Sequence, residues 1–182
     1  MKKLILIRHG ETEYTRQRRY CGHGDIPLNI KGIEQAKRLR AKLKNIKIDI
    51  IYSSDLKRAL QTAKIAFPKR IIYKRKGLRE NDFGQFSGLT FGEASKIYPR
   101  VYRRWMCNPL EAKIPDGENL PNFAKRVEGC FKRIFDRNPK RTVVLVSHGG
   151  AIRIMLLKLR HQGWDKFWDI TVKTADVNII RF

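Results

Sequence analysis

The chain has 182 residues, of which 42% are hydrophobic, so it can bury a sizeable core and is too apolar for a disordered protein. Lys and Arg number 40 against 17 Asp and Glu, which gives a net charge of +23. Because these basic residues are spread along the chain and form no single tail, we interpret them as a solubilising surface that also attracts small anions.

No stretch has the length and hydropathy of a membrane span, and the first apolar run is too short for a signal peptide. We therefore expect a cytoplasmic protein without a membrane partner, folded as one domain over residues 1–182. Cys21, Cys107 and Cys130 are odd in number and far apart, which favours free thiols over a disulfide framework. The oligomeric state cannot be inferred from the sequence.

The first predicted strand covers Leu4–Ile7, where four apolar residues follow one another without polar alternation. That pattern is typical of a strand buried on both faces of a parallel sheet. The strand ends at Arg8 and His9, and Gly10 allows the backbone to turn sharply there. Residues 13–29 are polar and contain glycines and a proline, so we expect a long loop over the strand end, of a kind that is often functional.

Helices and strands alternate through the middle of the chain. Asn29 is expected to cap a helix over residues 31–43, whose apolar residues recur at helical spacing. Ser53-Ser54-Asp55 follows the second predicted strand and offers a cap to the next helix. The further predicted elements are strands at 48–52 and 70–73, helices at 56–66, 91–97, 100–106, 123–137 and 151–159, a short helix at 164–168, and loops at 78–90 and 108–121.

A second apolar run, Thr142–Ser147, is similar to the first and also ends in a histidine, His148, followed by two glycines. Residues 175–182 alternate between apolar and polar and predict an edge strand. Strands that alternate with helices favour an α/β fold. We therefore predict a three-layer α/β/α sandwich with a mostly parallel central sheet and an edge strand at the C-terminus.

Two such strands would each deliver a histidine to the carboxyl edge of the sheet, where open α/β sheets bind ligands. Arg58, in the first turn of the helix after the second strand, would join Arg8, His9 and His148 there. Guanidinium groups match phosphoryl oxygens, and the helix that opens at Gly149 would point backbone N–H groups at an anion. These residue types predict a phosphate site.

Within that site His9 would be the nucleophile, because nearby cations disfavour its protonated form. The departing alkoxide needs a proton, and Glu80, on the glycine-bounded loop at 78–90, is the candidate general acid, with Asp82 as the alternative. Phe83 and Phe86 are expected to pack inward and pin this loop to the core.

Four sequence blocks resemble the histidine phosphatase superfamily, in its phosphoglycerate-mutase-like branch, over nearly the whole chain. The blocks are Arg8-His9-Gly10-Glu11-Thr12, the segment 53–63 around Arg58, Leu78-Arg79-Glu80, and Ser147-His148-Gly149-Gly150. The resemblance implies a phosphatase in which His9 is phosphorylated transiently and Glu80 protonates the leaving group. It also implies that Arg8, Arg58 and His148 bind the phosphoryl group without a metal or other cofactor. Substrate contacts are expected from Arg8, Thr15, Tyr20, Cys21, Gly22, Arg58 and Gly149.

Two positions depart from the family pattern. Thr15 stands where the family often has Asn, and Ser87 stands where many members have Glu, so substrate contacts there are expected to differ. His23 and His161 match no catalytic position in the family. We expect His161 on the surface and His23 in an exposed loop that could face the substrate.

Other phosphate chemistries fit the sequence less well. A cysteine phosphatase needs Arg six positions after its Cys, where this chain has Pro27, Lys113 and Asp136, and the Gly-Lys pair of a P-loop is absent. Four histidines, two of them assigned to phosphate, are few for a dinuclear metal site. A nucleic-acid-binding protein on a phosphatase-like fold is the alternative from another class, based on the +23 charge alone. Otherwise we expect only non-specific binding to nucleic acid.

The expected partner is a small phosphomonoester. By resemblance, a mutase would carry added segments between the proton-donor block and the last histidine, so a phosphatase is favoured. The segment 78–84 resembles the version found in α-ribazole phosphatases; broad-specificity, phosphoserine and sugar-phosphate phosphatases are the alternatives. We expect the loops at 13–29 and 108–121 to line the mouth of the site, with Tyr14 and Tyr20 able to stack on a flat ring.

Overall fold

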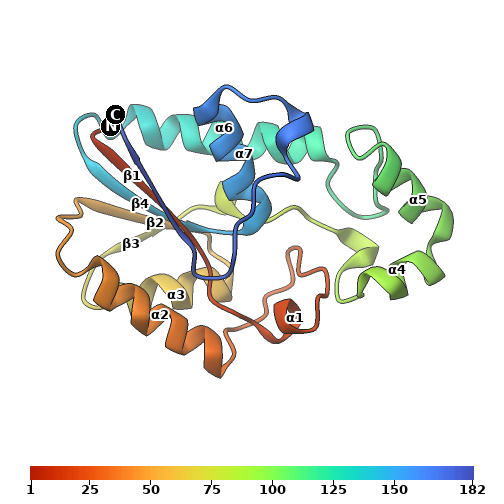
Figure 1. The fold of residues 1–182 in the computed structure, drawn as a ribbon, viewed down its shortest axis with the longest axis horizontal. Helices are drawn as coiled ribbons and strands as arrows, with labels where there is room; N and C mark the ends of the chain where they lie inside the picture. Colours follow the sequence, from red (N-terminus) through yellow and green to blue (C-terminus); the bar gives the residue numbers. More distant parts are fainter.

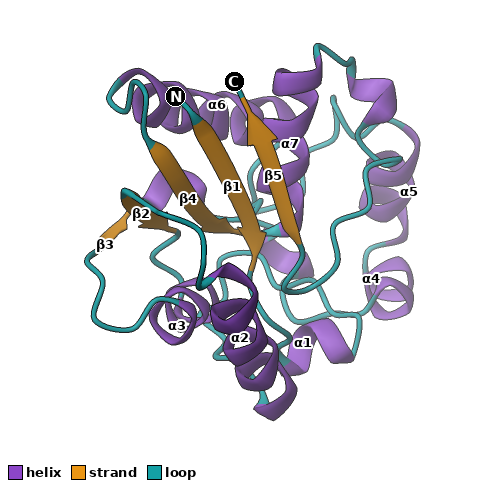
Figure 2. Cartoon of the chain, turned by 60° about the vertical axis from the view of Figure 1, so that its left-hand side comes forward, coloured by secondary structure: helices purple, strands orange, loops and turns teal.

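The computed structural model describes residues 1–182 and contains one five-stranded sheet in the order β3-β2-β4-β1-β5 (Figure 2). The four parallel strands are β1 (Lys3–Arg8), β2 (Ile50–Ser53), β3 (Ile72–Lys74) and β4 (Thr142–Ser147). Strand β5 (Val177–Arg181) pairs antiparallel with β1 at one edge. The predicted mostly parallel sheet with a C-terminal edge strand is confirmed.

Helices cover both faces of the sheet, which makes the molecule a three-layer sandwich (Figure 1). On one face lie α2 (Ile30–Leu43) and α3 (Lys57–Ala66); on the other lie α6 (Leu120–Asp136) and α7 (Gly149–Arg160). Strand β1 packs against the helices on both faces of the sheet, because Leu4 and Leu6 belong to one core cluster while Ile5 and Ile7 belong to the other. Both faces being buried explains why its sequence shows no alternation.

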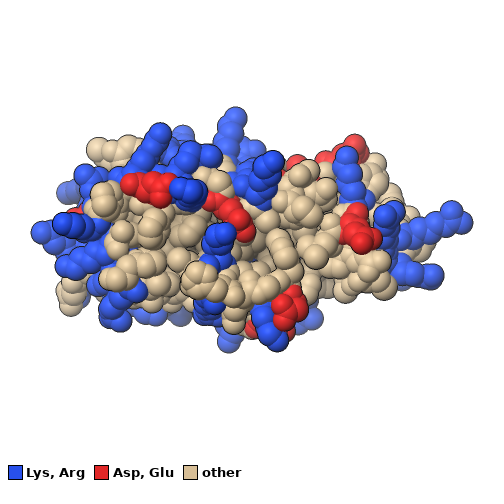
Figure 3. Space-filling model, turned by 90° about the horizontal axis from the view of Figure 1, so that it is seen from above, with Lys and Arg blue, Asp and Glu red and all other residues tan.

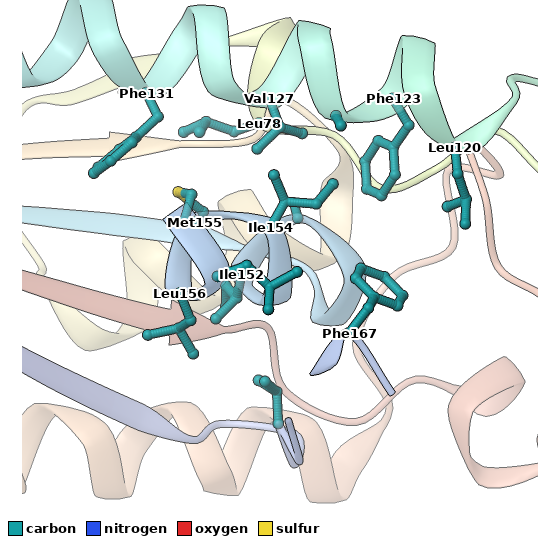
Figure 4. Packing of buried hydrophobic residues seen from close by; sticks show 14 of the residues in the cluster. Leu78, Leu120, Phe123, Val127, Phe131, Ile152, Ile154, Met155, Leu156 and Phe167 are labelled. Carbon is teal, nitrogen blue, oxygen red and sulfur yellow. The ribbon is translucent and has the colours of Figure 1, made fainter. Parts of the chain in front are cut away.

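The larger core cluster lies between α6, α7 and the sheet (Figure 4). Phe123, Val127 and Phe131 recur at i, i+4 and i+8 along α6 and point towards Ile152 and Met155 of α7. Because all five side chains are buried, the first turn of α7 is held rigidly against the sheet edge. That turn carries Gly149 and Gly150, so this packing fixes part of the predicted site.

Helices α4 (Phe91–Ile97) and α5 (Pro99–Cys107) project to one side of the sandwich, beyond the carboxyl ends of the strands (Figure 1). The short α1 (Glu13–Arg16) lies below them, and the 3-10 turn η3 (Trp164–Lys166) lies above. Two further 3-10 turns, η1 (Lys76–Leu78) and η2 (Gly84–Phe86), flank the segment that carries Glu80.

Several predicted boundaries were wrong for identifiable reasons. The loop expected at 13–29 contains α1, because Thr12 and Thr15 form a reciprocal capping box around one helical turn. Helix α6 begins three residues earlier than predicted, since Asn119 caps it through a hydrogen bond from Asn122 N (2.8 Å). The cap expected for α3 is also wrong: its N-cap is Leu56, which makes no side-chain cap. The other deviations are small, with β2 at 50–53, β3 at 72–74, β5 at 177–181, α5 starting at 99 and α7 spanning 149–160.

No helix of the structure is both long and apolar enough to cross a bilayer. In the view from above, Lys and Arg side chains clearly outnumber Asp and Glu (Figure 3). They lie on both ends of this view and between them, and in the sequence they fall in many elements. Their spread agrees with the absence of a basic tail in the sequence.

Candidate active site

The two histidine-bearing strands are neighbours in the sheet. Strands β1 and β4 pair in parallel with Arg8 opposite Ser147, so the residues that follow, His9 and His148, leave the sheet side by side. Their ring centroids lie 5.1 Å apart, with planes inclined by 58°. Both histidines therefore lie together at the carboxyl edge of the sheet, as predicted.

His9 is almost fully buried and has a defined orientation. Its Nδ1 lies 2.7 Å from the carbonyl oxygen of Gly10; since a carbonyl only accepts, Nδ1 donates and Nε2 keeps a free lone pair. Burial lowers the pKa of His9 well below its ordinary value, and the cations Arg58 and Arg8 lower it further. A neutral imidazole with a free Nε2 has the electronic form of a nucleophile.

The turn after His9 is held by a hydroxyl that the sequence did not single out. Gly10 N donates to Thr62 Oγ1 (3.0 Å), and the same hydroxyl donates to the carbonyl of Arg58 (2.7 Å). A Cβ on Gly10 would lie 2.6 Å from the carbonyl oxygen of Gly32, so α2 packs directly on this turn. The strand end and the first turn of α3 therefore form one rigid unit.

Arg58 is fully buried and is held at all three nitrogen atoms. Its Nη1 and Nη2 donate to the carbonyl oxygens of Gly24 (2.7 Å) and Gly22 (2.8 Å), and its Nε lies 3.2 Å from His148 Nδ1. A guanidinium has five N–H groups, so one on each Nη is still free for an anion. Gly22, expected to contact substrate, instead orients Arg58 through its carbonyl and does not line the cavity.

His148 is fully buried behind Arg58. Besides its contact with Arg58, its Nε2 lies 2.9 Å from Ser54 Oγ, so both ring nitrogens have protein partners. Burial, followed by Arg58, lowers the pKa of His148 well below its ordinary value. The ring does not line the cavity, which differs from the direct phosphoryl contact that the resemblance implies.

Arg8 reaches the cavity from the end of β1. Its Nη1 donates to the carbonyl of Val172 (2.6 Å), while its Nε is buried without a partner. A buried cationic donor without an acceptor is costly, and an anionic ligand would satisfy it. The guanidinium packs beside Gly149, where a Cβ would lie in ordinary contact, 3.5 Å from Arg8 Cζ.

Glu80 lies on the cavity wall, at the first turn of α7. Its Oε2 accepts from Gly150 N (3.0 Å) and its Oε1 accepts from Asn81 N (3.0 Å). A Cβ on Gly150 would overlap Glu80 Oε1, so the carboxylate occupies the space that the glycine leaves. The side chain of Asp82, the alternative acid, contacts Gly84 N and His23 and does not line the cavity.

These groups surround a cavity of about 530 Å³. Most of the predicted site residues are on its wall, namely Arg8, His9, Thr15, Tyr20, Cys21, Arg58, Glu80 and Gly149. The wall also contains residues that the sequence did not indicate, namely Arg19, Phe83, Phe91, Tyr102, Trp105, Met106, Gly150, Arg153 and Trp168. Arg8 and Arg58 act on His9 and form what we call the cationic end of the cavity. The rings of Tyr20, Phe83, Phe91 and Trp105 pack on one another and belong to what we call its aromatic end.

Three of the expected substrate contacts are constrained by their surroundings. The Thr15 hydroxyl donates to Thr12 O (2.9 Å) and accepts from Thr12 N (2.8 Å), so it serves the cap of α1. Burial raises the pKa of the Cys21 thiol and also that of the Tyr20 hydroxyl. Tyr20 presents its ring, which packs 4.8 Å from Phe83 and 5.0 Å from Phe91 between centroids.

The expectation for the mouth of the site was partly wrong. The segment at 108–121 does not line the cavity; α4, α5 and Trp168 take its place. Phe86 is fully buried as expected, whereas Phe83 is half-buried and forms part of the wall. Tyr102, Trp105 and Met106 follow helical spacing in the sequence, a signal that could have identified this face of α5.

The two remaining histidines lie outside the cavity. His161 is exposed, as expected, and ends α7 in a left-handed conformation with φ of 54°. His23 is half-buried, and its Nε2 lies 3.0 Å from the backbone oxygen of Glu80. His23 therefore faces the acidic loop and not the cavity, contrary to the suggestion that it could face substrate.

A buried arginine, a half-buried arginine, a neutral histidine and a carboxylate on one cavity wall are the components of a phosphoryl-transfer site. A family model described as "Histidine phosphatase superfamily (branch 1)" matches residues 4–182. The chain belongs to this family, as the four sequence blocks indicated, and it is a phosphatase.

Two relatives and one solved structure are similar to this chain over most of its length. The chain is 37% identical over 182 residues to phosphoserine phosphatase 1 of Hydrogenobacter thermophilus, covering 99% of this chain and 86% of that protein. It is 38% identical over 163 residues to phosphoglycerate mutase-like protein 4 of Arabidopsis thaliana, covering 87% of this chain and 71% of the relative. The crystal structure of the α-ribazole phosphatase from Shigella flexneri superposes with a TM-score of 0.91 at 27% identity, over 97% and 89% of the two chains.

Proposed function

We propose that this phosphatase hydrolyses small phosphomonoesters through a covalent phosphohistidine on His9. The observation that carries this proposal is the His9 ring, buried and neutral between two arginines with its Nε2 free. In the first step Nε2 forms a bond to phosphorus while the bond from phosphorus to the ester oxygen breaks. In the second step water attacks the phosphohistidine, which releases inorganic phosphate and restores the imidazole.

The cationic end of the cavity would hold the transferred phosphoryl group. Arg8 contributes its unpaired buried Nε, and Arg58 contributes the free N–H groups of its two terminal nitrogens. The N-terminus of α7, at Gly149 beside Arg8, adds its positive dipole end. His148 acts on phosphate through Arg58, whose guanidinium it orients.

Glu80 is the proposed general acid of the first step and general base of the second. It would give its proton to the departing alkoxide and then accept one from the attacking water. Positioned proton transfer of this kind contributes about 10²- to 10⁴-fold. Support comes from its place beside Gly150 on the wall of the cavity that Arg8 and Arg58 also line.

The aromatic end of the cavity favours a bulky, flat leaving group. Tyr20, Phe91, Tyr102, Trp105 and Trp168 offer ring faces and edges within one wall. Such a surface suits an aromatic base better than a short aliphatic chain. We therefore propose α-ribazole 5′-phosphate as the substrate, a choice that the likeness to the Shigella enzyme also supports.

Phosphoserine is the second candidate. The relative from Hydrogenobacter bears that name at 37% identity, and two further arginines lie on the cavity wall. Arg153 is held by Ile170 O through its Nε (2.8 Å), and Arg19 contacts Glu93 (2.7 Å). Either guanidinium could meet a carboxylate on the leaving group.

The experiment compares kcat/KM for α-ribazole 5′-phosphate, phosphoserine and 3-phosphoglycerate at one pH and salt concentration. We expect α-ribazole 5′-phosphate to exceed both others by at least tenfold, about 1.4 kcal/mol in transition-state binding. If phosphoserine leads by that margin, the substrate proposal is replaced by the second candidate. Rapid quench with labelled substrate tests the mechanism separately: an acid-labile, base-stable phosphoenzyme must form, and His9→Ala must abolish both label and turnover.

A further inference from the structure

The segment that carries Glu80 is held from behind by one side chain of α6. Arg126 donates through Nη2 to the backbone oxygen of Glu80 (3.0 Å) and through Nη1 to those of Arg79 (3.2 Å) and Gly77 (3.2 Å). Three carbonyl groups of the short segment 77–80 thus converge on one guanidinium. Few side chains other than arginine can donate to so many acceptors in one plane.

The guanidinium is itself fixed by a carboxylate. Its Nε and Nη2 donate to Glu118 Oε1 (2.9 Å) and Oε2 (2.7 Å) in a bidentate pair, and both side chains are largely shielded from solvent. The Arg126 guanidinium also lies 5.2 Å above the ring of Phe123. The backbone N–H of Glu118 donates to Asp82 O (2.8 Å), so the pair holds the chain on both sides of Glu80.

The segment is also pressed closely against α6. A Cβ on Gly77 would lie 2.5 Å from the Cβ of Cys130, one helical turn beyond Arg126. Helix α6 packs on α7, whose Gly150 N–H binds the Glu80 carboxylate. The acid therefore has its backbone fixed by one helix and its carboxylate fixed by the next.

We propose that Arg126, paired with Glu118, is the positioning residue for the general acid Glu80. The Arg126 guanidinium does not line the cavity and touches no reacting group, so it acts only through the placement of the acid. This inference rests on the proposed role of Glu80. It predicts a specific loss of leaving-group protonation when the pair is removed, with phosphoryl binding and attack by His9 retained.

The test uses the full chain and two substrates that differ in their need for an acid. p-Nitrophenyl phosphate has a leaving group that departs readily without a proton, whereas β-glycerophosphate needs one. The variants are Arg126→Met, the charge-neutral double variant Arg126→Met/Glu118→Gln, and Glu80→Gln. Lys125→Met is the matched control, since it removes a neighbouring cation from the exposed side of the same helix. The measured quantity is kcat/KM, which covers the steps up to departure of the leaving group and excludes hydrolysis of the phosphohistidine.

We expect both Arg126 variants to lose at least tenfold on β-glycerophosphate and less than threefold on p-nitrophenyl phosphate, with Lys125→Met unchanged on both. In a Glu80→Gln background, Arg126→Met should add less than threefold on β-glycerophosphate, because the acid it positions is already absent. Equal losses on both substrates, no loss on either, or full additivity with Glu80→Gln would overturn the inference. The double variant separates the role of the guanidinium from instability caused by an unpaired Glu118, and thermal melting of each variant verifies folding.

Glu80→Gln alone distinguishes this inference from the proposed function. If Glu80→Gln affects both substrates equally, Glu80 is not the acid and the proposed mechanism fails at that point. If Glu80→Gln shows the selective loss while Arg126→Met does not, only the positioning role of Arg126 is refuted.

Discussion

Arg58 Nε donates to His148 Nδ1 across 3.2 Å at the buried end of the site. Because a guanidinium N–H can only donate, Nδ1 must accept, and the single proton of the neutral ring lies on Nε2 towards Ser54 Oγ. The second histidine of the site is thus an acceptor that aligns the arginine. The side-chain hydroxyl of Ser54 completes a chain of contacts from the loop at the end of β2 to the guanidinium of Arg58, which we propose binds phosphate.

His148→Ala should weaken oxyanion binding while sparing the nucleophile. Removing the acceptor frees the Arg58 guanidinium from one of its three partners, so we expect inhibition by vanadate to weaken about tenfold or more, about 1.4 kcal/mol. Labelling of His9 should still be detectable by rapid quench. His161→Ala, on the exposed end of α7, is the control and should leave both measurements unchanged.

Stability should fall on acidification because both site histidines are buried in the neutral form. Burial lowers the pKa of His9 and of His148 well below 6.5, so below pH 6.5 the unfolded chain binds protons that the folded chain does not. The stability that the two neutral histidines contribute is fully present above pH 6.5. It is lost as the pH falls from 6.5 towards their pKa values in the folded protein, by up to about 1.4 kcal/mol per pH unit for each histidine. Urea unfolding at several pH values measures this slope. His148→Gln, which cannot take up a proton, should reduce it; an unchanged slope would contradict the assignment.

Gly150→Ala should damage catalysis more than folding. A Cβ at this position would overlap Glu80 Oε1 and approach Phe123 Cε1 to 3.1 Å, so the acid must move. We expect at least a tenfold loss of kcat/KM on β-glycerophosphate and a smaller loss on p-nitrophenyl phosphate. Gly92→Ala provides the comparison, because its Cβ would meet nothing within 4 Å. If the two variants were equally active, catalysis would not require the Glu80 carboxylate to be held in a fixed position.

Phe91→Ala tests whether the aromatic wall recognises the leaving group. Phe91 lines the cavity yet is 54% exposed, so truncation should leave the fold intact. The expected effect is a three- to tenfold loss of kcat/KM for α-ribazole 5′-phosphate, about 0.7 to 1.4 kcal/mol, with less than a twofold loss for phosphoserine. Ile97→Ala, 56% exposed on the same helix and away from the cavity, is the matched control. Equal losses on both substrates would show that the aromatic wall does not discriminate between them.

The net charge of +23 should produce weak binding to nucleic acid that disappears with salt. Because the basic side chains are spread over many elements, we expect no sequence preference and a steep fall in affinity between about 50 and 200 mM salt. Fluorescence anisotropy with two unrelated duplexes measures both properties. Tight binding at physiological salt that persists in His9→Ala would favour the nucleic-acid-binding alternative.

The sheet and the cationic end of the site were predictable because their signals are local. The apolar runs before His9 and His148 each identify a buried strand, and parallel pairing brings their ends together. The role of His148 was not predictable, since it depends on which nitrogen faces Arg58 across 90 positions of sequence. Arg126 was missed for the same reason: its partners lie 46 to 49 residues away and are backbone oxygens, which leave no trace in residue type.

The aromatic wall failed to appear in the prediction because it is built by tertiary packing. Tyr102 and Trp105 have the spacing of an ordinary amphipathic helix, and only the docking of α5 beside Tyr20 and Phe83 turns that face into a cavity wall. The segment at 108–121 was expected at the mouth because it would flank the strand ends. In the structure its Pro115 carbonyl instead accepts from Gln85 N (3.1 Å), which supports the loop behind Glu80.

Cys21 lies on the cavity wall, and burial keeps its thiol protonated by raising its pKa. Oxidants and alkylating reagents attack thiolates, so this sulfur is a poor target even though it adjoins the substrate. The proposed nucleophile is an imidazole, which hydrogen peroxide does not convert to a sulfenic acid. On this mechanism the protein would still release phosphate under oxidative stress that inactivates phosphatases with a catalytic cysteine, and the exposed Cys107 would be modified first.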